Sequence, residues 1–442
     1  MFAQEHFSGL NTSSQVGIMT ATLNPAELVN MKHKFQINVF SGSINVSNNK
    51  IGFSDLTSNK NLESLIFTGS DPVNLRADAE FYLPSIAMKY KKFAFAIIPK
   101  GNAKLDVVDV DTHLGDAITN AAANSIFGSA TTVNNNYNQR VNGTTWGEIG
   151  FTGAMNIVNN ATHKINIGTT LKMLFPGSYA NLGLDKFQGT IVTNSITGQA
   201  ELRNTTANLN IAYSGGLTNS FTNFNDYTKS VFGGLNGFSG DIGVNYQWKD
   251  LPESNPKKNS NKYKLNVGMS IKNIGSMTFK DDNNSSKNYL LQIQGTQSLN
   301  LNQFQNVNSL PQIETILLNS GYLIEQNKEK NFKVKLPTTF NLYADVKLIP
   351  KFFISGLIQQ KINNNSSNDQ ITAQNIISIT PRFDTGFFEV FAPFNNTQIS
   401  GFSSGIGFRV GGFYLGSGSI ITALINDSKQ GDIYTGYRFS FL

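Results

Sequence analysis

The feature that most constrains the fold is a strict alternation of apolar and polar residues in two neighbouring segments, residues 237–248 and 263–272. A period of two is the period of a β-strand, and it puts all apolar side chains of a segment on one face. The predicted apolar faces comprise Phe238, Ile242, Val244, Tyr246 and Trp248 in the first segment, and Tyr263, Leu265, Val267, Met269 and Ile271 in the second. The polar residues 249–262 between the two segments predict a long hairpin loop.

Aromatic residues stand at the ends of these apolar faces, at Phe238, Trp248 and Tyr263. Strands of about 9–11 residues with aromatic side chains at the ends of an apolar face are typical of a membrane-spanning β-barrel, in which lipid lies outside and a polar lumen inside. The alternative is a soluble β-sandwich, in which the same face would point into a protein core. This pair of segments alone does not decide between the two folds.

Composition favours the barrel. Only 14% of the 442 residues are charged and 39% are hydrophobic, whereas soluble domains carry about 25% charged residues. A barrel accounts for this combination, because its lipid-facing band avoids charge while its lumen stays polar. No run of about 18 apolar residues occurs, so the sequence predicts no transmembrane helix.

The same alternation recurs along most of the chain. Predicted strands cover residues 34–46, 81–90, 93–110, 145–158, 164–175, 179–192, 201–213, 338–348, 352–361, 371–383, 385–393, 399–410, 413–425 and 433–442. Helical spacing in residues 114–127 and 311–326 predicts two short helices in loops or in the lumen. The expected fold is therefore all-β: a transmembrane antiparallel β-barrel of about 14 strands, with sixteen as the alternative count. Residues 32–442 form the predicted barrel, and residues 1–31 form an N-terminal segment that folds into its mouth.

Several short motifs resemble those of known outer-membrane barrels. Asn24-Pro25-Ala26 and residues 268–275 (GMSIKNIG) resemble elements of the long-chain fatty-acid transporter (FadL-like) and PorV-like families. The order of residues 34–40 (KFQINVF), 81–85 (FYLPS) and 146–150 (WGEIG) is similar to that in an uncharacterised Bacteroidota outer-membrane β-barrel family. The resemblance implies an outer-membrane barrel in which Asn24, Pro25 and Ala26 belong to a hatch inside the lumen, but it supplies no substrate.

Charged residues on the predicted polar faces are candidates for the lumen. They are Glu148, Lys164, Lys172, Asp241, Lys264 and Arg409. Interior ion pairing is expected of them rather than catalysis, because no histidine lies on a strand where it could join a serine and an acid. No nucleotide-binding or phosphate-loop fingerprint occurs either. The sequence therefore predicts no enzyme, no catalytic residue and no cofactor.

Metal and nucleic-acid sites are not predicted. The four histidines lie far apart in the sequence, without a second ligand at metal-binding spacing. Asp106, Asp109 and Asp111 form an acidic cluster that lacks the glycine and distal glutamate of an EF-hand loop. A surface calcium site is the alternative there to a solvated turn. No basic helix or basic motif with interleaved aromatic residues indicates nucleic-acid binding.

Two functions remain after these exclusions. One is a pore or FadL-like transporter for small or hydrophobic solutes, with a lumen partly closed by residues 1–31. The other is a non-transporting accessory or structural barrel of an envelope complex such as type IX secretion, as the PorV-like resemblance implies. The sequence does not separate them.

The expected location is the bacterial outer membrane. Residues 1–5 (MFAQE) fit the end of a signal peptide cut after Ala3, most of which would precede this sequence. The expected partners are the lipid bilayer and lipopolysaccharide and, for the accessory role, an envelope-complex protein.

Overall fold

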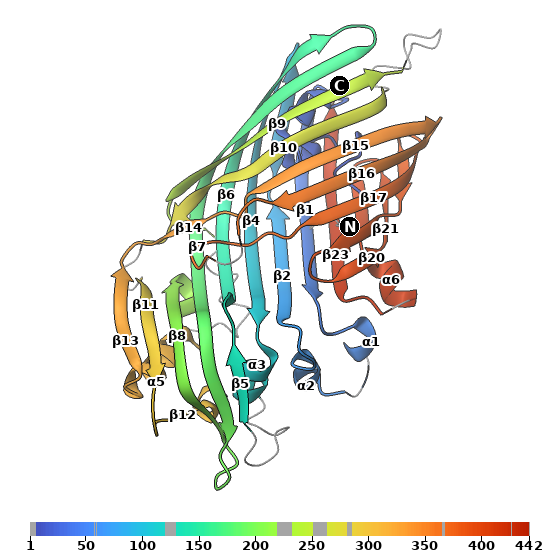
Figure 1. The fold of residues 1–442 in the computed structure, drawn as a ribbon. Coiled ribbons are helices and arrows are strands. Elements are labelled where there is room, and N and C mark those ends of the chain that lie inside the picture. The colour runs from blue at the N-terminus through green and yellow to red at the C-terminus, as the bar shows by residue number, and fades with distance from the viewer. Residues whose placement is uncertain are drawn as a thin grey trace.

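The chain forms a closed antiparallel β-barrel (Figure 1). The computed structural model describes residues 6–56, 58, 60–119, 130–218, 232–250, 263–280, 285–364, 367–425 and 427–441. The strands are β1 (Phe35–Asn48), β2 (Val73–Tyr82), β3 (Ser85–Tyr90), β4 (Phe93–Val110), β5 (Ala130–Asn134), β6 (Asn138–Asn159), β7 (His163–Thr193), β8 (Ala200–Ser214), β9 (Gly237–Lys249), β10 (Tyr263–Thr278), β11 (Ser285–Ile293), β12 (Leu299–Asn300), β13 (Leu323–Glu329), β14 (Lys333–Lys335), β15 (Thr339–Ile349), β16 (Phe352–Lys361), β17 (Ile376–Asp384), β18 (Phe388–Phe391), β19 (Phe394–Thr397), β20 (Gly401–Ser404), β21 (Ile406–Val410), β22 (Phe413–Ser417) and β23 (Gln430–Phe441).

Several of these strands follow one another along the same line of the barrel wall and together form one longer strand, here called a stave. The combined staves are β2 with β3, β5 with β6, β8 with β9, β10 with β11 and β12, β13 with β14 and β15, β18 with β19, and β20 with β21. Counted in this way, the described residues form fourteen staves. The first and last strands, β1 and β23, pair from Phe35 with Phe441 to Ser47 with Gln430 and close the ring. The predicted strand number and fold class are confirmed.

Short helices complete the described structure. They are the α-helices α1 (Phe53–Leu56), α2 (Leu62–Ile66), α3 (Thr112–Thr119), α5 (Leu310–Asn319) and α6 (Ile420–Ile425), and the 3-10 helices η1 (Gly17–Thr22), η2 (Pro25–Asn30), η3 (Gly215–Thr218) and η5 (Leu301–Phe304). Among the described residues, none of these helices has the length and apolar character needed to cross a membrane.

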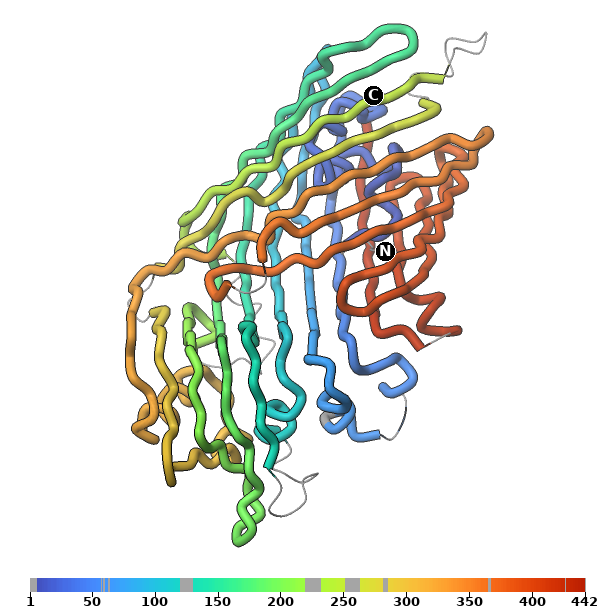
Figure 2. Tube along the Cα trace, viewed as in Figure 1, coloured from blue at the N-terminus to red at the C-terminus, as the bar shows by residue number. Residues whose placement is uncertain are grey.

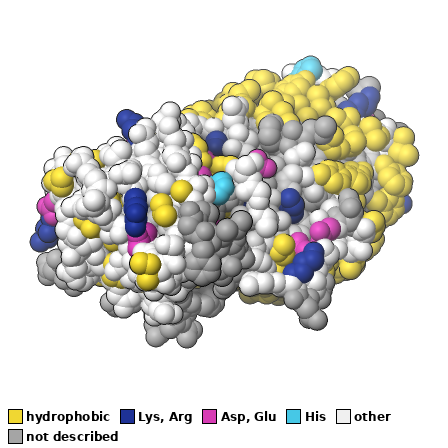
Figure 3. Space-filling model, turned by 60° about the horizontal axis from the view of Figure 1, so that its bottom comes forward, with side chains coloured by type: hydrophobic (Ala, Val, Ile, Leu, Met, Phe, Trp, Pro, Cys, Tyr) yellow, Lys and Arg dark blue, Asp and Glu magenta, His cyan; other side chains and the backbone are white. Residues whose placement is uncertain are grey.

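The apolar faces of β9 and β10 point away from the barrel axis. Ile242 is 52% exposed and Met269 50% exposed, while the polar residues between them, such as Asn245, are buried. The other residues of the predicted lipid-facing set are exposed at Phe238, Val244 and Trp248 and half-buried at Tyr246, Leu265 and Val267. Exposed apolar side chains gather over the barrel, whereas the part of the molecule at the left of Figure 3 is mostly polar. This exposed apolar band is the lipid-facing surface of a membrane-spanning barrel.

The alternation breaks at the start of β10, which corrects two predictions. A β-bulge between Tyr263 and Leu265 adds one residue to the strand, so the residues before it switch faces. Tyr263, predicted on the apolar face, is buried inside and its hydroxyl donates to the Asp345 carboxylate. Lys264, predicted in the lumen, is exposed on the outer face, with its Nζ 5.6 Å from the centre of the Trp248 ring.

Several predicted strands are shorter than expected, and two of them show why. Residues 371–375 belong to a loop, and β17 begins only at Ile376. β22 ends at Ser417, because the Ser417 hydroxyl accepts hydrogen bonds from the backbone N–H groups of Ser419 and Ile420 and so starts helix α6. The two predicted helices correspond to α3 and α5, but the second is shorter than predicted, because α5 ends at Asn319 and residues 323–326 belong to β13. Residues 120–129 of the first helix and the loop residues 251–262 lie outside the described residues.

Beyond the apolar band, several strands continue into an extension of the wall, seen at the lower left of Figure 1. The second half of β7 pairs with β5 and β8, β8 pairs with β11, and β11 pairs with β13. Together with α3, α5 and η5, these strands enclose an apolar cluster that includes Phe187, Leu209, Leu291 and Leu317. The extension therefore has an apolar core of its own. It lies at the end of the barrel that carries the long loops.

The apolar band yields a first prediction. We expect Ile242→Arg to destabilise the folded barrel by about 2–4 kcal/mol in a bilayer, because it puts a charge at mid-membrane depth. Ile196→Arg is the matched control, since Ile196 is 92% exposed in the turn between β7 and β8 and surface changes cost within about 0.5 kcal/mol. Equilibrium unfolding in phospholipid vesicles measures both. Equal effects of the two substitutions would contradict the membrane assignment.

A second prediction concerns Glu314 of α5, in the extension. Burial alone would raise the pKa of Glu314, but hydrogen bonds from Lys287, Tyr289 and Tyr213 outweigh it and hold that pKa below its usual 4.5. A carboxylate with a depressed pKa stabilises the fold above the unfolded pKa, and this contribution is lost as pH falls through the folded value.

We therefore expect Glu314→Gln to destabilise the extension at pH 7 by about 1–3 kcal/mol. The difference from wild type should shrink as the pH falls below about 4.5. Hydrogen exchange of β11 and α5 between pH 3 and pH 7 measures it. The exposed Glu325 provides the control, Glu325→Gln, and a Glu314 effect that does not depend on pH would refute the expectation.

Candidate functional site

The N-terminal residues 6–31, here called the plug, lie inside the barrel. In Figure 2 they form the coiled tube at the blue end of the chain, within the ring of strands. η2 packs against β4, β6, β7 and β9, and almost every side chain of the plug is buried. Within the described residues, the predicted N-terminal segment thus fills the lumen near the end of the barrel that carries the short turns.

Three glycines on adjacent strands receive Asn24, Pro25 and Ala26. A Cβ atom at Gly168 of β7 would come within 2.5 Å of the Ala26 nitrogen, and one at Gly243 of β9 within 1.9 Å of Asn24 Oδ1. A Cβ atom at Gly268 of β10 would come within 2.7 Å of Asn24 Nδ2. A residue larger than glycine at any of these three positions would collide with neighbouring side chains or with the plug. The three glycines, here called the glycine row, therefore let the plug backbone lie directly on the barrel wall.

Asn24 fixes the plug to the wall through its side chain. Its Nδ2 donates to the backbone carbonyl oxygens of Val244 at 2.9 Å and Met269 at 3.3 Å. Its Oδ1 accepts the N–H of Ala26 at 3.0 Å and so caps the start of η2. One amide side chain therefore both starts a helix of the plug and binds two neighbouring strands.

Glu27, also in η2, is held by neutral donors. Asn245 and Asn266 each donate to its Oε1 at 2.8 Å, and Tyr343 donates to the same atom at 2.5 Å. Glu27 is 5% exposed. Hydrogen bonds to a carboxylate are stronger than those between neutral groups, so this cluster ties η2 to β9, β10 and β15. The predicted lumen residue Lys164 lies beside it and donates to Asn30 Oδ1 at 2.6 Å.

The first part of the plug packs through apolar contacts. Phe7 lies among three wall tyrosines, with its ring centre 5.8 Å from that of Tyr82, 6.3 Å from Tyr414 and 5.7 Å from Tyr434. Leu10, Val16, Ile18 and Met19 belong to the same buried cluster. The plug is therefore joined to the wall by an apolar contact as well as by the polar contacts of η2.

A second segment crosses the lumen nearer the long-loop end. This crossing loop, residues 362–375, leaves β16 and reaches the opposite wall before β17 begins; residues 365 and 366 lie outside the described part. Tyr179 donates to the Asn368 carbonyl oxygen at 2.7 Å, and Arg140 Nη1 donates to the Gln370 carbonyl oxygen at 3.3 Å. Arg76 Nη2 donates to the Thr372 hydroxyl. The loop is thus held at its far side by β2, β6 and β7.

A chamber of about 670 Å³, including the part open to solvent, lies between the plug and the crossing loop. Its lining contains plug residues such as His6 and Asn11, wall residues such as Lys100 and Glu148, and Ala373 of the crossing loop. A smaller adjoining cavity of about 340 Å³ is lined by Lys172 and Asp241. The chamber is therefore bounded by the wall and by the two segments that cross the lumen.

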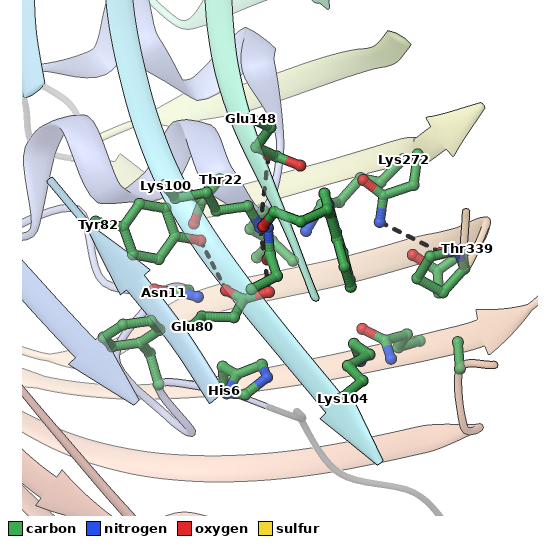
Figure 4. A pocket seen from close by; sticks show the side chains of 18 residues that line it. His6, Asn11, Thr22, Glu80, Tyr82, Lys100, Lys104, Glu148, Lys272 and Thr339 are labelled. Carbon is green, nitrogen blue, oxygen red and sulfur yellow. Dashed lines mark hydrogen bonds and ion pairs between the residues drawn. The ribbon is translucent and has the colours of Figure 1, made fainter. Parts of the chain in front are cut away.

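Alternating carboxylates and ammonium groups run along the chamber wall (Figure 4). Lys100 Nζ lies 3.1 Å from Glu80 Oε1 and 3.6 Å from Glu148 Oε1. Tyr82 also donates to Glu80, at 2.9 Å. Lys172 lies 3.8 Å from the same Glu148 oxygen and 2.8 Å from Asp241 Oδ2. Three of the predicted lumen residues, Glu148, Lys172 and Asp241, are thus brought into one network.

Arg409, the remaining predicted lumen residue, lies away from this chamber, near the short-turn end. Its Nε lies 2.8 Å from Glu389 Oε2, and Arg382 lies 3.0 Å from the other oxygen of that carboxylate. Sequence reasoning missed Arg382 and Glu389. It also missed Glu80 and Lys100 of the chamber, although both alternate with outward apolar residues in β2 and β4.

Within the described residues, no three His, Asp or Glu side chains come close enough together to hold a metal ion. Asp106, which the sequence placed in an acidic cluster, pairs with Arg76 at 2.6 Å. Asp109 accepts a hydrogen bond from Asn74, and Asp111 accepts the N–H groups at the start of α3. These three carboxylates therefore have separate partners.

Comparison with known proteins gives one family and several distant folds. The chain matches the model described as "Family of unknown function (DUF5723)" over residues 25–418. No curated protein sequence matches.

Among solved structures, the toluene transporter TbuX of Ralstonia pickettii is 11% identical, with a TM-score of 0.42 over 97% of this chain and 95% of that one. The toluene transporter TodX of P. putida is 9% identical, with a TM-score of 0.41 over 95% and 92% of the two chains. A Pseudomonas aeruginosa FadL homologue is 9% identical, with a TM-score of 0.37 over 99% and 98%. Similarities at this level say nothing about a substrate.

The glycine row yields a third prediction. We expect Gly243→Ala to displace the plug, because the new methyl group would meet Asn24 at 1.9 Å. Since the chain has no cysteine, a single Ala21→Cys reporter, at a plug position that is 3% exposed, can measure this. Its maleimide labelling should be slow in the parent barrel and at least about tenfold faster with Gly243→Ala, as a loss of about 1.4 kcal/mol in plug docking would give.

The control is Gly153→Ala on β6, where an added Cβ meets no atom within 4 Å. Labelling that is equally slow in all three proteins would show that the glycine row does not hold the plug.

Proposed function

The chain belongs to DUF5723, a family of unknown function, and from the geometry of its lumen we propose that it is a gated transporter for small or hydrophobic solutes in the bacterial outer membrane. The proposal does not draw on what the distant barrels carry. It depends on how the spaces in the lumen follow one another.

The observation that carries the proposal is a series of three cavities along the lumen. A cavity of about 510 Å³ faces the long loops and is lined by Arg76, Thr372 and Ala373. The chamber follows on the other side of the crossing loop, since Ala373 lines both spaces. A mouth of about 1030 Å³, lined by Gln15, Lys32 and Arg438, lies at the short-turn end beyond the plug.

Two segments that are not staves of the barrel separate these spaces. The plug is held mainly by side-chain contacts, and the crossing loop by side-chain contacts together with backbone hydrogen bonds to Lys335, Thr338 and Gln398. Either segment can therefore move without opening the ladder that closes the barrel. A wall that stays intact while its contents move is the requirement for gated passage.

A second candidate is the accessory or structural barrel of an envelope complex, for which type IX secretion is the example that the PorV-like resemblance suggests. Two observations favour it. The plug has its own apolar contact around Phe7, which opposes movement. The extension also projects beyond the apolar band and ends in β13, whose residues from Ile324 to Glu329 are all exposed. In this role the extension would bind the partner, while lipid and lipopolysaccharide surround the barrel in either case.

Permeability of reconstituted liposomes separates the two candidates and is the fourth prediction. We expect low permeability to small solutes for the full chain, and a large increase when residues 1–31 are deleted or when Gly243→Ala displaces the plug. Deleting the segment removes the boundary between the chamber and the mouth, whereas Gly153→Ala should leave permeability unchanged.

Correct folding of each variant is checked by the shift in electrophoretic mobility of the unboiled barrel. Equally negligible permeability in the full chain and in both plug variants, all of them folded, would reject transport and favour the accessory role.

A further inference from the structure

Exposed lysines are spread around the short-turn end of the barrel. They comprise Lys34 before β1, Lys91 and Lys92 in the turn between β3 and β4, Lys264 at the start of β10, and Lys351 in the turn between β15 and β16. Together they are here called the rim lysines. They are distributed over a wide arc of the wall, from β1 to β16, and do not form one compact patch.

The rim lysines carry positive charge that the protein itself does not neutralise. None of them takes part in an ion pair between described residues. The described carboxylates near these turns already have partners. Asp250 pairs with Lys347, while Asp384 and Glu389 are buried and lie 3.9 Å and 2.8 Å from Arg409. The short-turn end therefore presents a positive charge to its surroundings.

Aromatic rings on the outer face accompany several of these charges. Lys91 Nζ lies 5.3 Å from the centre of the Tyr90 ring, and Lys264 is placed in the same way over Trp248. Both rings are exposed, and the same arrangement recurs at Lys92. Aromatic side chains are enriched where a membrane meets water, and lysines there direct their charge toward the headgroups. The rim lysines thus lie at the boundary of the apolar band.

The opposite end of the barrel differs in its charge. Cations and carboxylates are mixed there and several are paired, such as Lys60 with Asp55 at 2.7 Å and Arg203 with Glu201 at 2.6 Å. A cation that has a carboxylate partner leaves less charge for a lipid headgroup. The two leaflets of the bilayer therefore meet different surfaces, a mixed one at the long-loop end and a positive one at the short-turn end.

The placement of the rim lysines indicates which anion they meet. They border the lipid-facing band, so the nearest groups outside the protein are the headgroups of the lipids that surround the barrel. Clusters of four to eight basic residues beside a membrane-spanning segment attract anionic lipids. A protein partner would cover one side of the barrel, whereas these charges extend around the wall from β1 to β16.

We propose that the short-turn rim binds the headgroups of anionic phospholipids and selects them from the surrounding bilayer. This inference goes beyond the proposed function, because a transporter and an accessory barrel would both carry such a rim. Its test needs no measurement of permeability.

The test, our fifth prediction, uses Trp248 as the reporter, since it is exposed and lies beside Lys264. In a Trp146→Phe variant it is the remaining tryptophan of the two. The variant is reconstituted in phosphatidylcholine that contains brominated phosphatidylglycerol or brominated phosphatidylcholine, and quenching gives the relative affinity of each lipid. We expect phosphatidylglycerol to bind about fivefold more strongly at about 10 mM salt, the contribution of one lysine near an anionic surface.

This preference should disappear at about 1 M salt, where the screening length is only about 3 Å. Lys264→Gln should remove most of it. Lys186→Gln is the matched control, because Lys186 is an exposed lysine of β7 in the extension, so the same charge is lost far from Trp248. The proposal is overturned by equal quenching from both lipids, by a preference that persists at about 1 M salt, or by equal effects of the two substitutions.

A second pair of reporters tests the extent of the rim. In a chain without the native tryptophans, Phe93→Trp places the reporter beside Lys92, whereas Phe402→Trp places it near the long-loop end, where Phe402 is 57% exposed. Phosphatidylglycerol should be preferred at the first position and not at the second. No preference at the first position, or an equal one at both, would contradict the proposal.

Correct folding of each variant is checked by its mobility shift without boiling. If the loss of Trp146 prevents folding, the parent chain carries the Trp248 measurement, because Trp146 is 3% exposed and adds a constant signal.

Discussion

Alternation in a closed sheet sends every second side chain into the lumen, and in this barrel the lumen contains protein. Charged groups on the inner face therefore meet other side chains and need partners of opposite charge. The wall supplies them across neighbouring strands: Arg76 pairs with Asp106, Lys172 with Asp241 and Arg409 with Glu389. The Glu27 carboxylate in η2 of the plug is compensated differently, by neutral donors: Asn245, Asn266 and Tyr343 of the wall and Asn30 of the plug. The polar side chains on the inner face of the wall therefore hold the plug in position and border the chamber beside it.

The outer surface could be predicted from the sequence because it depends on a local rule. A period of two determines which residues face lipid, so β9 and β10 were correctly placed with their apolar faces outward. The rule failed at Tyr263 and Lys264, where a bulge adds a residue and reverses the faces. It also failed at residues 413–425, since apolar residues in a short helix and in a strand look alike when Ser417 starts the helix. Residues 371–375 were mistaken for a strand because the contact that holds Thr372 comes from Arg76, some 296 positions away in the sequence.

The interior could be predicted only in part. Asn24, Pro25 and Ala26 were noticed through a family resemblance, but the row of Gly168, Gly243 and Gly268 that receives them depends on the register of three strands. No local pattern shows that Asn24 lies beside Val244, some 220 positions away. The ion pairs around Glu148 could have been predicted, because Glu80 and Lys100 occupy inward positions of the alternating pattern on their strands.

The connection between the plug and β1 sets a limit on what the plug can do. η2 ends at Asn30 and β1 begins at Phe35, so residues 31–34 form the whole tether. The five Cα–Cα steps from Asn30 to Phe35 span at most about 17–18 Å, which is less than the thickness of a membrane's hydrocarbon core, about 30 Å. With η2 intact, the end of the plug next to β1 therefore stays within this distance of the barrel rim. The plug can only rotate about this short tether. Any passage that opens must therefore run beside the plug.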